Sequence, residues 1–557
     1  MKNLTSIIFT CFLFASSLCC AENIPEIMNK AKQGDAEAQF KIAALYASGK
    51  IGKKDQESQN IMLDWLEKSA SQNYAKAQNI LYKKYFQLEK FEKAAKWAKE
   101  AIKRKDKTAM SVMAYLNYFG CNGVPINMQK AFELSEQSMD QPLSQVIQGR
   151  FYLNGCENFE KDISQAKDCA EKAIKMKNPY GYVLMADIYL SGDKGDDENL
   201  RNAEKNLQEA IKMDCSEAMV KLADLYLDNY GTTEKTVKAT NLYVQASKFL
   251  NPASFRQLAL YVLEKNNSDV LLKYQTMEAL KDAAKYGDPQ AQVLLWECYT
   301  TNKYGFETDN ALAKQYMTEA INSGDPEALY DFAMILKRIN DSSDNKELQA
   351  YKASIDNQYT YESLLEKAVN NLHPIANYVY GLTLNDSGAD GMPYIYRAAN
   401  MGVPEAQFTI ANTLLESDLE QSLHWALNAS KNKEINSLAL AGSFLMEGKG
   451  CEQDCQRGIE LLEEAAMNGN KGAMERLVEE YYLAERVEQD FEKAYLYSRM
   501  IDDENYDQIV ENCKEQFSED KLQELEIKYA EMMALCAIKS AENKYNLQKR
   551  FAIKYLK

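Results

Sequence analysis

One short sequence recurs along this 557-residue chain. It reads Gly-Asp-Ala-Glu-Ala-Gln at positions 34–39 and returns with small changes at 287–292, 324–329 and 402–407. Successive copies begin 253, 37 and 78 residues apart. These intervals correspond to seven units of about 36, one of about 37 and two of about 39 residues, which is the length of a helical-pair repeat. The spacing predicts a stack of helical hairpins.

Each residue of the recurring hexapeptide has a role at a junction between helices. Glycine adopts the left-handed conformation just past the last turn of a helix without a steric clash. Aspartate accepts hydrogen bonds from the free amides at the next helix start, and proline fits the first helical position. The small alanine that follows lets neighbouring helices approach closely. The hexapeptide therefore predicts where one helix ends and the next begins.

Further positions repeat in the same phase. A tyrosine lies eight positions after the alanine in many units, at Tyr46, Tyr85, Tyr152, Tyr189, Tyr226, Tyr261, Tyr299 and Tyr481. A glycine lies eleven positions after it at Gly49, Gly120, Gly155, Gly192 and Gly448. The second helix carries an aromatic or apolar residue shortly before an alanine, as in Trp65 with Ala70 and Trp425 with Ala429. We count about 13 such units in the chain. A tyrosine at one repeat position favours interhelical packing over ligand binding.

This pattern resembles the Sel-one-like repeat (SLR) family, a relative of the tetratricopeptide repeats. The features of resemblance are an Ala-x3-Leu-Gly-x2-Tyr-x2-Gly core and a following Ala-x2-Trp-x3-Ala-Ala. The Leu-Gly pair is poorly kept, for example as Ala441-Gly442. The resemblance covers most of residues 25–500. It implies an all-α fold, a right-handed superhelical α/α solenoid of about 13 hairpins, which binds a protein partner on its concave face.

The predicted organisation has three parts. Residues 1–21 read as a signal peptide, because Lys2 precedes an apolar run and small residues end at Ala21. A lipoprotein anchored through Cys19 or Cys20 and an uncleaved anchor are the alternatives, and Leu18 is too large for a lipobox. Residues 22–500 form the solenoid, and 501–557 form a C-terminal helical cap. A self-association helix is the alternative for this last part. The signal peptide places the protein in the periplasm or outside the cell.

Charge restricts the class of partner. Removal of Lys2 with the signal peptide leaves 64 Lys and Arg against 82 Asp and Glu, a net charge of −18. Such a chain repels nucleic acid and anionic lipid, so neither is expected as a partner. No later stretch approaches the ~20 apolar residues that a membrane span requires. We expect a monomer. The basic end at 544–557 is an exception to the acidic composition of the chain.

Residues for catalysis are scarce. The only histidines, His373 and His424, fall in different repeats, which argues against a histidine-based triad or a multi-histidine metal site. His373 precedes Pro374 and is expected at a turn. The sequence therefore predicts no catalytic residue, no cofactor and no metal.

Nine cysteines follow Ala21, an odd number that implies a free thiol or an intermolecular bond in an exported protein. Two disulfides are candidates. Cys121 and Cys156 occupy equal positions in adjacent units, and Cys451 and Cys455 flank a short loop. Equal positions in stacked hairpins are expected to lie somewhat beyond disulfide reach, so the first bond needs loop movement.

Candidate contact residues are those that break the repeat pattern. Tyr82 and Trp296 occupy a position that holds a small residue in other units. They either fill gaps between repeats or project into the concave groove. A lengthened insert at 337–361, rich in Asn, Ser and Asp, predicts a long loop or an extra helix.

The leading hypothesis for function is an exported scaffold that binds a protein partner of unknown identity. Its work would be in envelope assembly, host interaction or regulation of cell-wall enzymes. One alternative is a periplasmic immunity protein that neutralises a secreted toxin, such as a type VI secretion lipase. Another is a cell-wall or β-lactam hydrolase.

Overall fold

The computed structural model describes residues 24–551, except 54, 122–123, 156–160, 192–196, 231–232, 250, 265–269, 342–350, 353, 356–357 and 502. Over these residues the secondary structure is helical, and the β-structure is limited to one isolated bridge between Cys121 and Val124. The all-α prediction is confirmed. The predicted signal peptide lies outside the described residues, as do most of the insert at 337–361 and the last six residues of the basic end.

The recurring hexapeptide ends one helix and begins the next, as predicted. Asp35 caps helix α3 (Ala36–Ser48) by accepting a hydrogen bond from the Ala38 amide at 2.7 Å. Asp288 caps α17 (Pro289–Thr301) in the same way through Ala291. The four glycines that open the hexapeptides have φ between 72° and 101°, which is the left-handed region. The helix boundaries are thus set locally, by glycine and aspartate.

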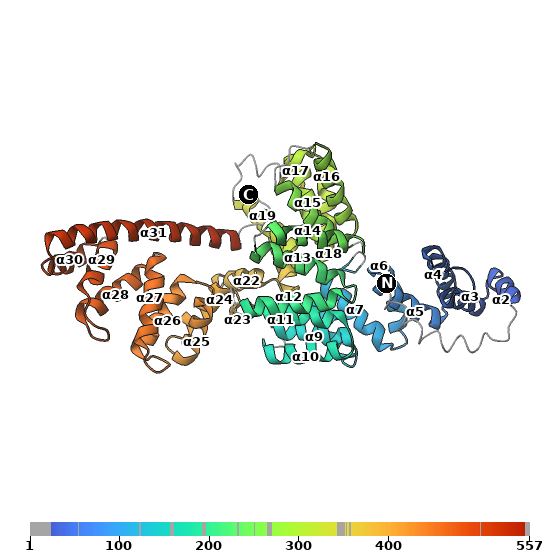
Figure 1. Ribbon diagram of the computed structural model, residues 1–557, viewed down its shortest axis with the longest axis horizontal. Helices are drawn as coiled ribbons and strands as arrows, with labels where there is room; N and C mark the ends of the chain where they lie inside the picture. The colour runs from blue at the N-terminus through green and yellow to red at the C-terminus, as the bar shows by residue number, and fades with distance from the viewer. Residues whose placement is uncertain are drawn as a thin grey trace. The chain divides into compact units, whose positions relative to one another are not determined.

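The chain divides into two compact units, each described here by itself. The first comprises residues 1–153, 162–332 and 336–360, and the second comprises residues 154–161, 333–335 and 361–557. In both units a helix contacts chiefly the helices before and after it in the chain, as expected for stacked repeats (Figure 1).

The helices of the first unit follow one another with short turns between them. In addition to α3 and α17 they are α2 (Ile24–Lys32), α4 (Gln56–Ser71), α5 (Ala75–Gln87), α6 (Phe91–Ile102), α7 (Lys107–Phe119), α8 (Met128–Glu136), α9 (Pro142–Asn154), α10 (Ile163–Lys175), α11 (Pro179–Leu190), α12 (Asp197–Ile211), α13 (Ser216–Tyr230), α14 (Thr233–Ser247), α15 (Pro252–Glu264), α16 (Val270–Lys285), the 3-10 helix η1 (Lys303–Gly305), α18 (Asn310–Ser323) and α19 (Pro326–Asp341).

The second unit continues the pattern and ends in a long helix. Its helices are α21 (Tyr361–Asn370), α22 (Pro374–Asp386), α23 (Met392–Asn400), α24 (Pro404–Thr413), α25 (Leu419–Ser430), α26 (Ile435–Glu447), α27 (Cys455–Met467), α28 (Lys471–Leu483), α29 (Phe491–Ile501), the 3-10 helix η2 (Glu504–Tyr506), α30 (Asp507–Lys514) and α31 (Glu519–Phe551).

The repeated tyrosine packs between helices and satisfies its hydroxyl locally. The hydroxyls of Tyr226 and Tyr481 donate to Glu204 at 2.6 Å and to Glu463 at 2.8 Å. In each case the glutamate lies on the helix directly before that of the tyrosine. Tyr481 is itself buried. The prediction of packing rather than ligand binding is confirmed at these two positions.

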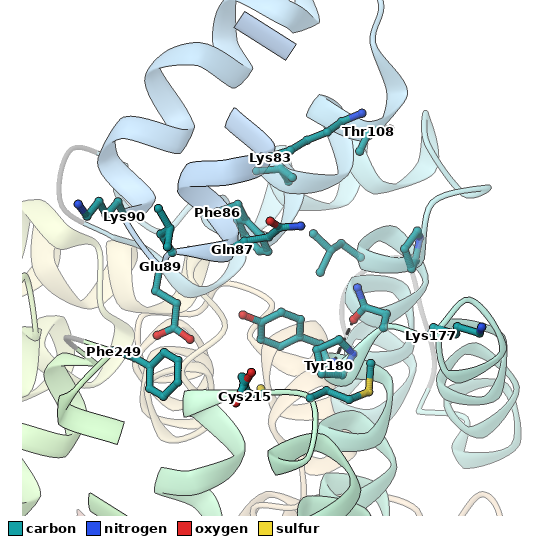
Figure 2. A pocket seen from close by; sticks show the side chains of 18 of the residues that line it. Lys83, Phe86, Gln87, Glu89, Lys90, Thr108, Lys177, Tyr180, Cys215 and Phe249 are labelled. Atoms are coloured by element: carbon teal, nitrogen blue, oxygen red, sulfur yellow. Dashed lines mark hydrogen bonds between the residues drawn. The ribbon is translucent and has the colours of Figure 1, made fainter. Parts of the chain in front are cut away.

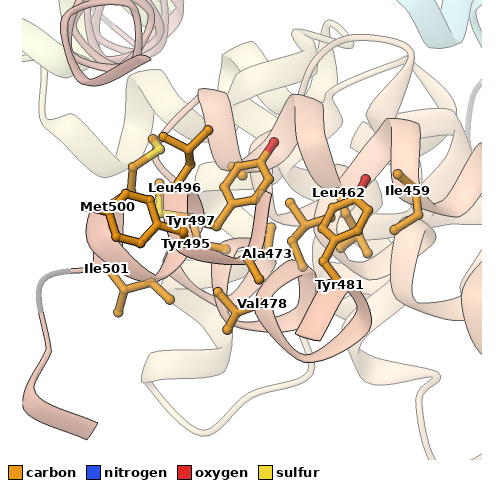
Figure 3. Close-up of a cluster of buried hydrophobic side chains, with 14 of the residues drawn as sticks. Ile459, Leu462, Ala473, Val478, Tyr481, Tyr495, Leu496, Tyr497, Met500 and Ile501 are labelled. Carbon is orange, nitrogen blue, oxygen red and sulfur yellow. The ribbon is translucent and has the colours of Figure 1, made fainter. Parts of the chain in front are cut away.

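One buried hydrophobic cluster of the second unit lies between its last hairpins (Figure 3). Leu462, Leu477 and Val478 are fully buried there, beside Tyr495 from α29. Leu525 of α31 enters the same core, so the C-terminal helices pack on the repeats. Their helical structure agrees with the prediction for this region.

Candidate functional site

A pocket of about 730 Å³ opens in the first unit where several hairpin turns meet (Figure 2). Its lining comes from α4, from α5 and the turn after it, and from the first turns of α7 and α9. The turns that precede α11, α13 and α15 complete it. Most of the lining therefore comes from turns and helix ends, with a smaller part from within α4 and α7.

The floor of the pocket is apolar and aromatic. Leu63, Val112 and Leu143 are buried beneath it. The rings of Phe86 and Tyr180 lie 6.1 Å apart between centroids, and both contact the buried ring of Tyr115. Aromatic rings in such a floor supply a large contact area to an apolar side chain.

The rim of the pocket is basic, unlike the chain as a whole. Five lysines line it, all exposed: Lys83, Lys90, Lys177, Lys212 and Lys248. Glu89 and Asp214 are the acidic residues among the lining residues, so the formal charge of the lining is +3, whereas that of the chain is −17. The amino end of α11 also faces this pocket, with Asn178 as its cap, and a helix amino end favours a negative ligand.

A hydrogen-bonded group, here called the Glu89 clasp, joins Glu89, which lines the pocket, to two residues far from it in sequence. It consists of Glu89, Ser216 and Asn251. The Ser216 hydroxyl donates to Glu89 at 2.5 Å, and the Asn251 amide donates to Ser216 at 2.9 Å. Glu89 has a φ of 53°, which is strained for a residue other than glycine. Burial, reinforced by the charge of Glu217, raises the pKa of Glu89 to about 7.

The raised pKa makes the clasp sensitive to pH. The contribution of Glu89 to stability is complete at acidic pH and is lost as the pH rises through about 7, because the folded protein favours the protonated acid. For the turn after α5, we compare the amide exchange rate of the parent protein with that of the Glu89→Gln variant. We expect the ratio of the parent rate to the variant rate to rise as the pH goes from about 6 to about 8. Hydrogen exchange with mass spectrometry on both proteins at each pH measures this ratio. A constant ratio would contradict the assignment.

An ion network behind the floor holds α9, α11 and α13 together. Arg150 on α9 contacts Asp187 on α11 at 2.9 Å and Glu217 on α13 at 3.3 Å. Lys221 binds the other oxygen of Asp187 at 2.9 Å. Burial alone would raise the pKa of Asp187, but the charges of Lys221 and Arg150 hold it below its usual value. Tyr115 donates to Glu217 at 2.7 Å and so connects the network to the aromatic floor.

The two predicted contact residues lie in the core. Tyr82 and Trp296 have no exposed surface. Tyr82 donates to Asp106 at 3.0 Å, and Trp296 donates to Ser354 at 3.1 Å. Of the two alternatives, filling of gaps between helices is therefore the one that the structure supports. The other alternative, contact with a partner, is not supported, because neighbouring side chains cover both rings.

The candidate disulfides have different outcomes. Cys451 and Cys455 are free thiols. They face different clusters, since Cys451 packs beside Ala441 and Phe444 whereas Cys455 packs on the core of the last hairpins. The structure therefore contains no Cys451–Cys455 bond. The Cys121–Cys156 prediction lies outside the described residues, because Cys156 is not among them.

The two histidines belong to different helices. His373 precedes the first residue of α22, and His424 lies within α25. His373 is the cap of α22, where its Nδ1 accepts from the Ala376 amide at 2.9 Å, which confirms the predicted turn role. His424 is exposed on α25 and pairs with Asn428. Within the described part of the chain, no group of three or more His, Cys, Asp or Glu is arranged to hold a metal. The same residues include no helix that is long and apolar enough to cross a membrane.

Cys215 lines the pocket, and it and the adjacent Ser216 carry side chains of the nucleophilic type. Burial raises the pKa of Cys215 well above its usual value, so the sulfur stays a protonated thiol and a weak nucleophile. Ser216 is 1% exposed, and its hydroxyl is held between Glu89 and Asn251. A substrate carbonyl cannot reach it in this arrangement. Both groups fit a structural role.

The Sel1 repeat family model matches five segments, namely 36–74, 108–141, 149–178, 216–248 and 436–470. The match agrees with the resemblance seen in the sequence. Four of them contribute residues to the pocket, including Leu63, Val112, Lys177 and Lys248.

Solved structures of helical-repeat proteins are similar to this chain. One is c5321, a protective antigen of uropathogenic Escherichia coli with an SLR fold, at 17% identity over 94% of this chain and 97% of that one, with a TM-score of 0.37. A second is a Sel1 repeat protein from Oxalobacter formigenes, at 19% identity over 56% of this chain and 89% of that one, with a TM-score of 0.34. The third is yeast Tom70, at 14% identity over 87% and 99%, with a TM-score of 0.23. All three scores lie below 0.5, so nothing about function rests on them.

The sequence prediction missed the pocket, although a signal for it exists. Lys177 and Asp214 occupy the position of the hexapeptide glycine in two consecutive units. Lys177 and Asp214 keep the left-handed conformation, with φ of 57° and 60°. A side chain in that conformation costs roughly 1 kcal/mol or more. The signal is ambiguous, because Asn73 and Lys105 adopt the same conformation and do not line the pocket.

Proposed function

We propose that this protein is an exported interaction scaffold that binds an extended, acidic segment of a protein partner in the pocket of its first unit. A Sel1 repeat array is a scaffold suited to protein–protein interaction. The observation that carries the proposal is a basic rim around an aromatic floor in a chain that is otherwise strongly acidic.

The rim and the floor supply different parts of recognition. Lysines at the rim attract carboxylates over a distance and speed association, an effect that salt screens. The Phe86 and Tyr180 rings offer a desolvated surface for one apolar or aromatic side chain, the kind of contact that dominates binding energy in protein interfaces. A segment with an apolar residue between acidic residues fits both.

The role in the cell follows from the partner. A partner of the envelope or of a host surface makes the protein an adaptor. A secreted toxin in a stable stoichiometric complex makes it an immunity protein, whose deletion sensitises cells only in contact with siblings. Export through residues 1–21 is part of the proposal, and fractionation of cells that produce the intact chain tests it.

Charge reversal at the rim tests the binding surface. We expect Lys83→Glu, Lys177→Glu and Lys212→Glu together to weaken binding at least about tenfold, because three attractions become repulsions. The measurement is fluorescence anisotropy with a labelled synthetic peptide that has a central phenylalanine flanked by aspartates and glutamates.

The control reverses Lys167 and Lys205, which are exposed on α10 and α12 of the same unit and do not line the pocket. This control is expected to bind the peptide like the parent protein. Equal losses in the two variants, or equal binding of a peptide with lysines in place of the acids, would overturn the proposal.

A further inference from the structure

The long helix α31 uses only one of its faces within the second unit. It has 33 residues, and Leu525, Met532 and Cys536 point into the core of the last hairpins. Asn543, about two turns further along the same face, donates to Asn468 at 2.6 Å. This face fixes the helix on α27 and α29, which it follows in Figure 1.

A second apolar stripe runs along the opposite side of α31. Ile527, Ala530, Ala534, Ile538 and Ala541 recur every three or four residues, so they share one face, and all five are exposed. Ile527 is 65% exposed and Ile538 is 57% exposed. A helix that is apolar on two faces is normally covered on both, and large exposed aliphatic residues in a row mark an interaction surface. The alanines let another helix approach closely.

The charges of α31 show which helix would fit this surface. Residues 519–535 carry five acidic and two basic side chains, a net charge of −3. Residues 536–551 carry four basic and one acidic, a net charge of +3. The two halves of the helix are therefore equal and opposite in charge, and the exposed stripe extends across their boundary.

We propose that the exposed stripe of α31 pairs with the same stripe of a second copy of the chain, with the two helices antiparallel. In that arrangement each acidic half lies along the basic half of the other copy, and a two-fold axis near residue 535 relates them. A parallel pair would place like charges side by side. The pairing replaces the expectation of a monomer, and it is independent of the pocket in the first unit.

Mass measurement in solution tests the pairing. Size-exclusion chromatography with light scattering on the intact mature chain is expected to give twice the chain mass at micromolar concentration. The double variant Ile527→Glu/Ile538→Glu is expected to raise the dissociation constant about tenfold or more, because each glutamate places a charge in the apolar contact between the two helices. The control is Leu483→Glu at the end of α28, where the leucine is 58% exposed.

A charge exchange tests the antiparallel direction. Lys539→Glu with Lys544→Glu is expected to weaken the dimer, and the further changes Glu524→Lys and Glu531→Lys are expected to restore it, because opposite halves attract again. Circular dichroism confirms that every variant keeps its helices. A monomer at all concentrations, or a dimer that the Ile527/Ile538 variant leaves intact, would overturn the proposal. Failure of the charge exchange to restore the dimer would overturn its direction.

Discussion

Replacing Arg150 with alanine is expected to lower the free energy of unfolding of the first unit by about 3–5 kcal/mol. The Arg150 side chain is 9% exposed and bridges Asp187 and Glu217, which come from two further helices. Without it the two carboxylates lose their shared cation and lie in partly buried positions. The cost of a buried charge without its partner exceeds the net worth of the ion pair itself.

Lys221→Ala is the matched control for Arg150→Ala. Lys221 also contacts Asp187, but its side chain is 32% exposed, so water replaces much of the contact and we expect a loss of about 1 kcal/mol. Hydrogen exchange on α9, α11 and α13 reports the local loss in an array whose unfolding need not be two-state. Equal effects of the two substitutions would show that the buried network does not hold these helices.

Replacing Trp296 with alanine is expected to cost about 3–5 kcal/mol, because it empties a large volume in the core. The indole has no exposed surface, and its ring lies 5.0 Å from the Phe332 ring and 5.2 Å from the Tyr351 ring between centroids. The measurement is chemical unfolding followed by circular dichroism.

Trp296→Phe provides the comparison. It keeps an aromatic ring and loses the hydrogen bond to Ser354, so the expected cost is about 1–2 kcal/mol. If Trp296 were instead a contact residue for a partner, both substitutions would leave stability unchanged. That result would contradict the placement of Trp296 in the core.

The elements of the fold were predictable because local chemistry sets them. Gly34 and Asp35 act within a few residues of their own positions, and the repeat returns the same local instructions at a fixed interval. The break in pattern at Tyr82 and Trp296 was visible too. Its meaning was not, since whether a bulky side chain fills a gap or meets a partner depends on helices elsewhere in the chain.

The candidate site was harder to predict because its parts are far apart in sequence. Glu89 and Ser216 are separated by 127 residues, and Tyr115 and Glu217 by 102. No interval in the sequence predicts these contacts, which arise from the stacking of several hairpins. The composition gave no sign of the basic rim, because the chain has 82 acidic residues and only five lysines form the rim.

We propose that the pocket of the first unit holds a segment of a protein partner. The most direct test of this claim is photocrosslinking in cells that produce the protein, with benzoylphenylalanine at Gln87 in the pocket and, as control, at Gln165, which is exposed on α10 outside the pocket. We predict a discrete protein adduct from position 87 alone, with an acidic peptide at the crosslink, and its loss when Lys83, Lys177 and Lys212 are reversed in charge. No adduct from position 87, or the same adducts from position 165, would contradict the claim.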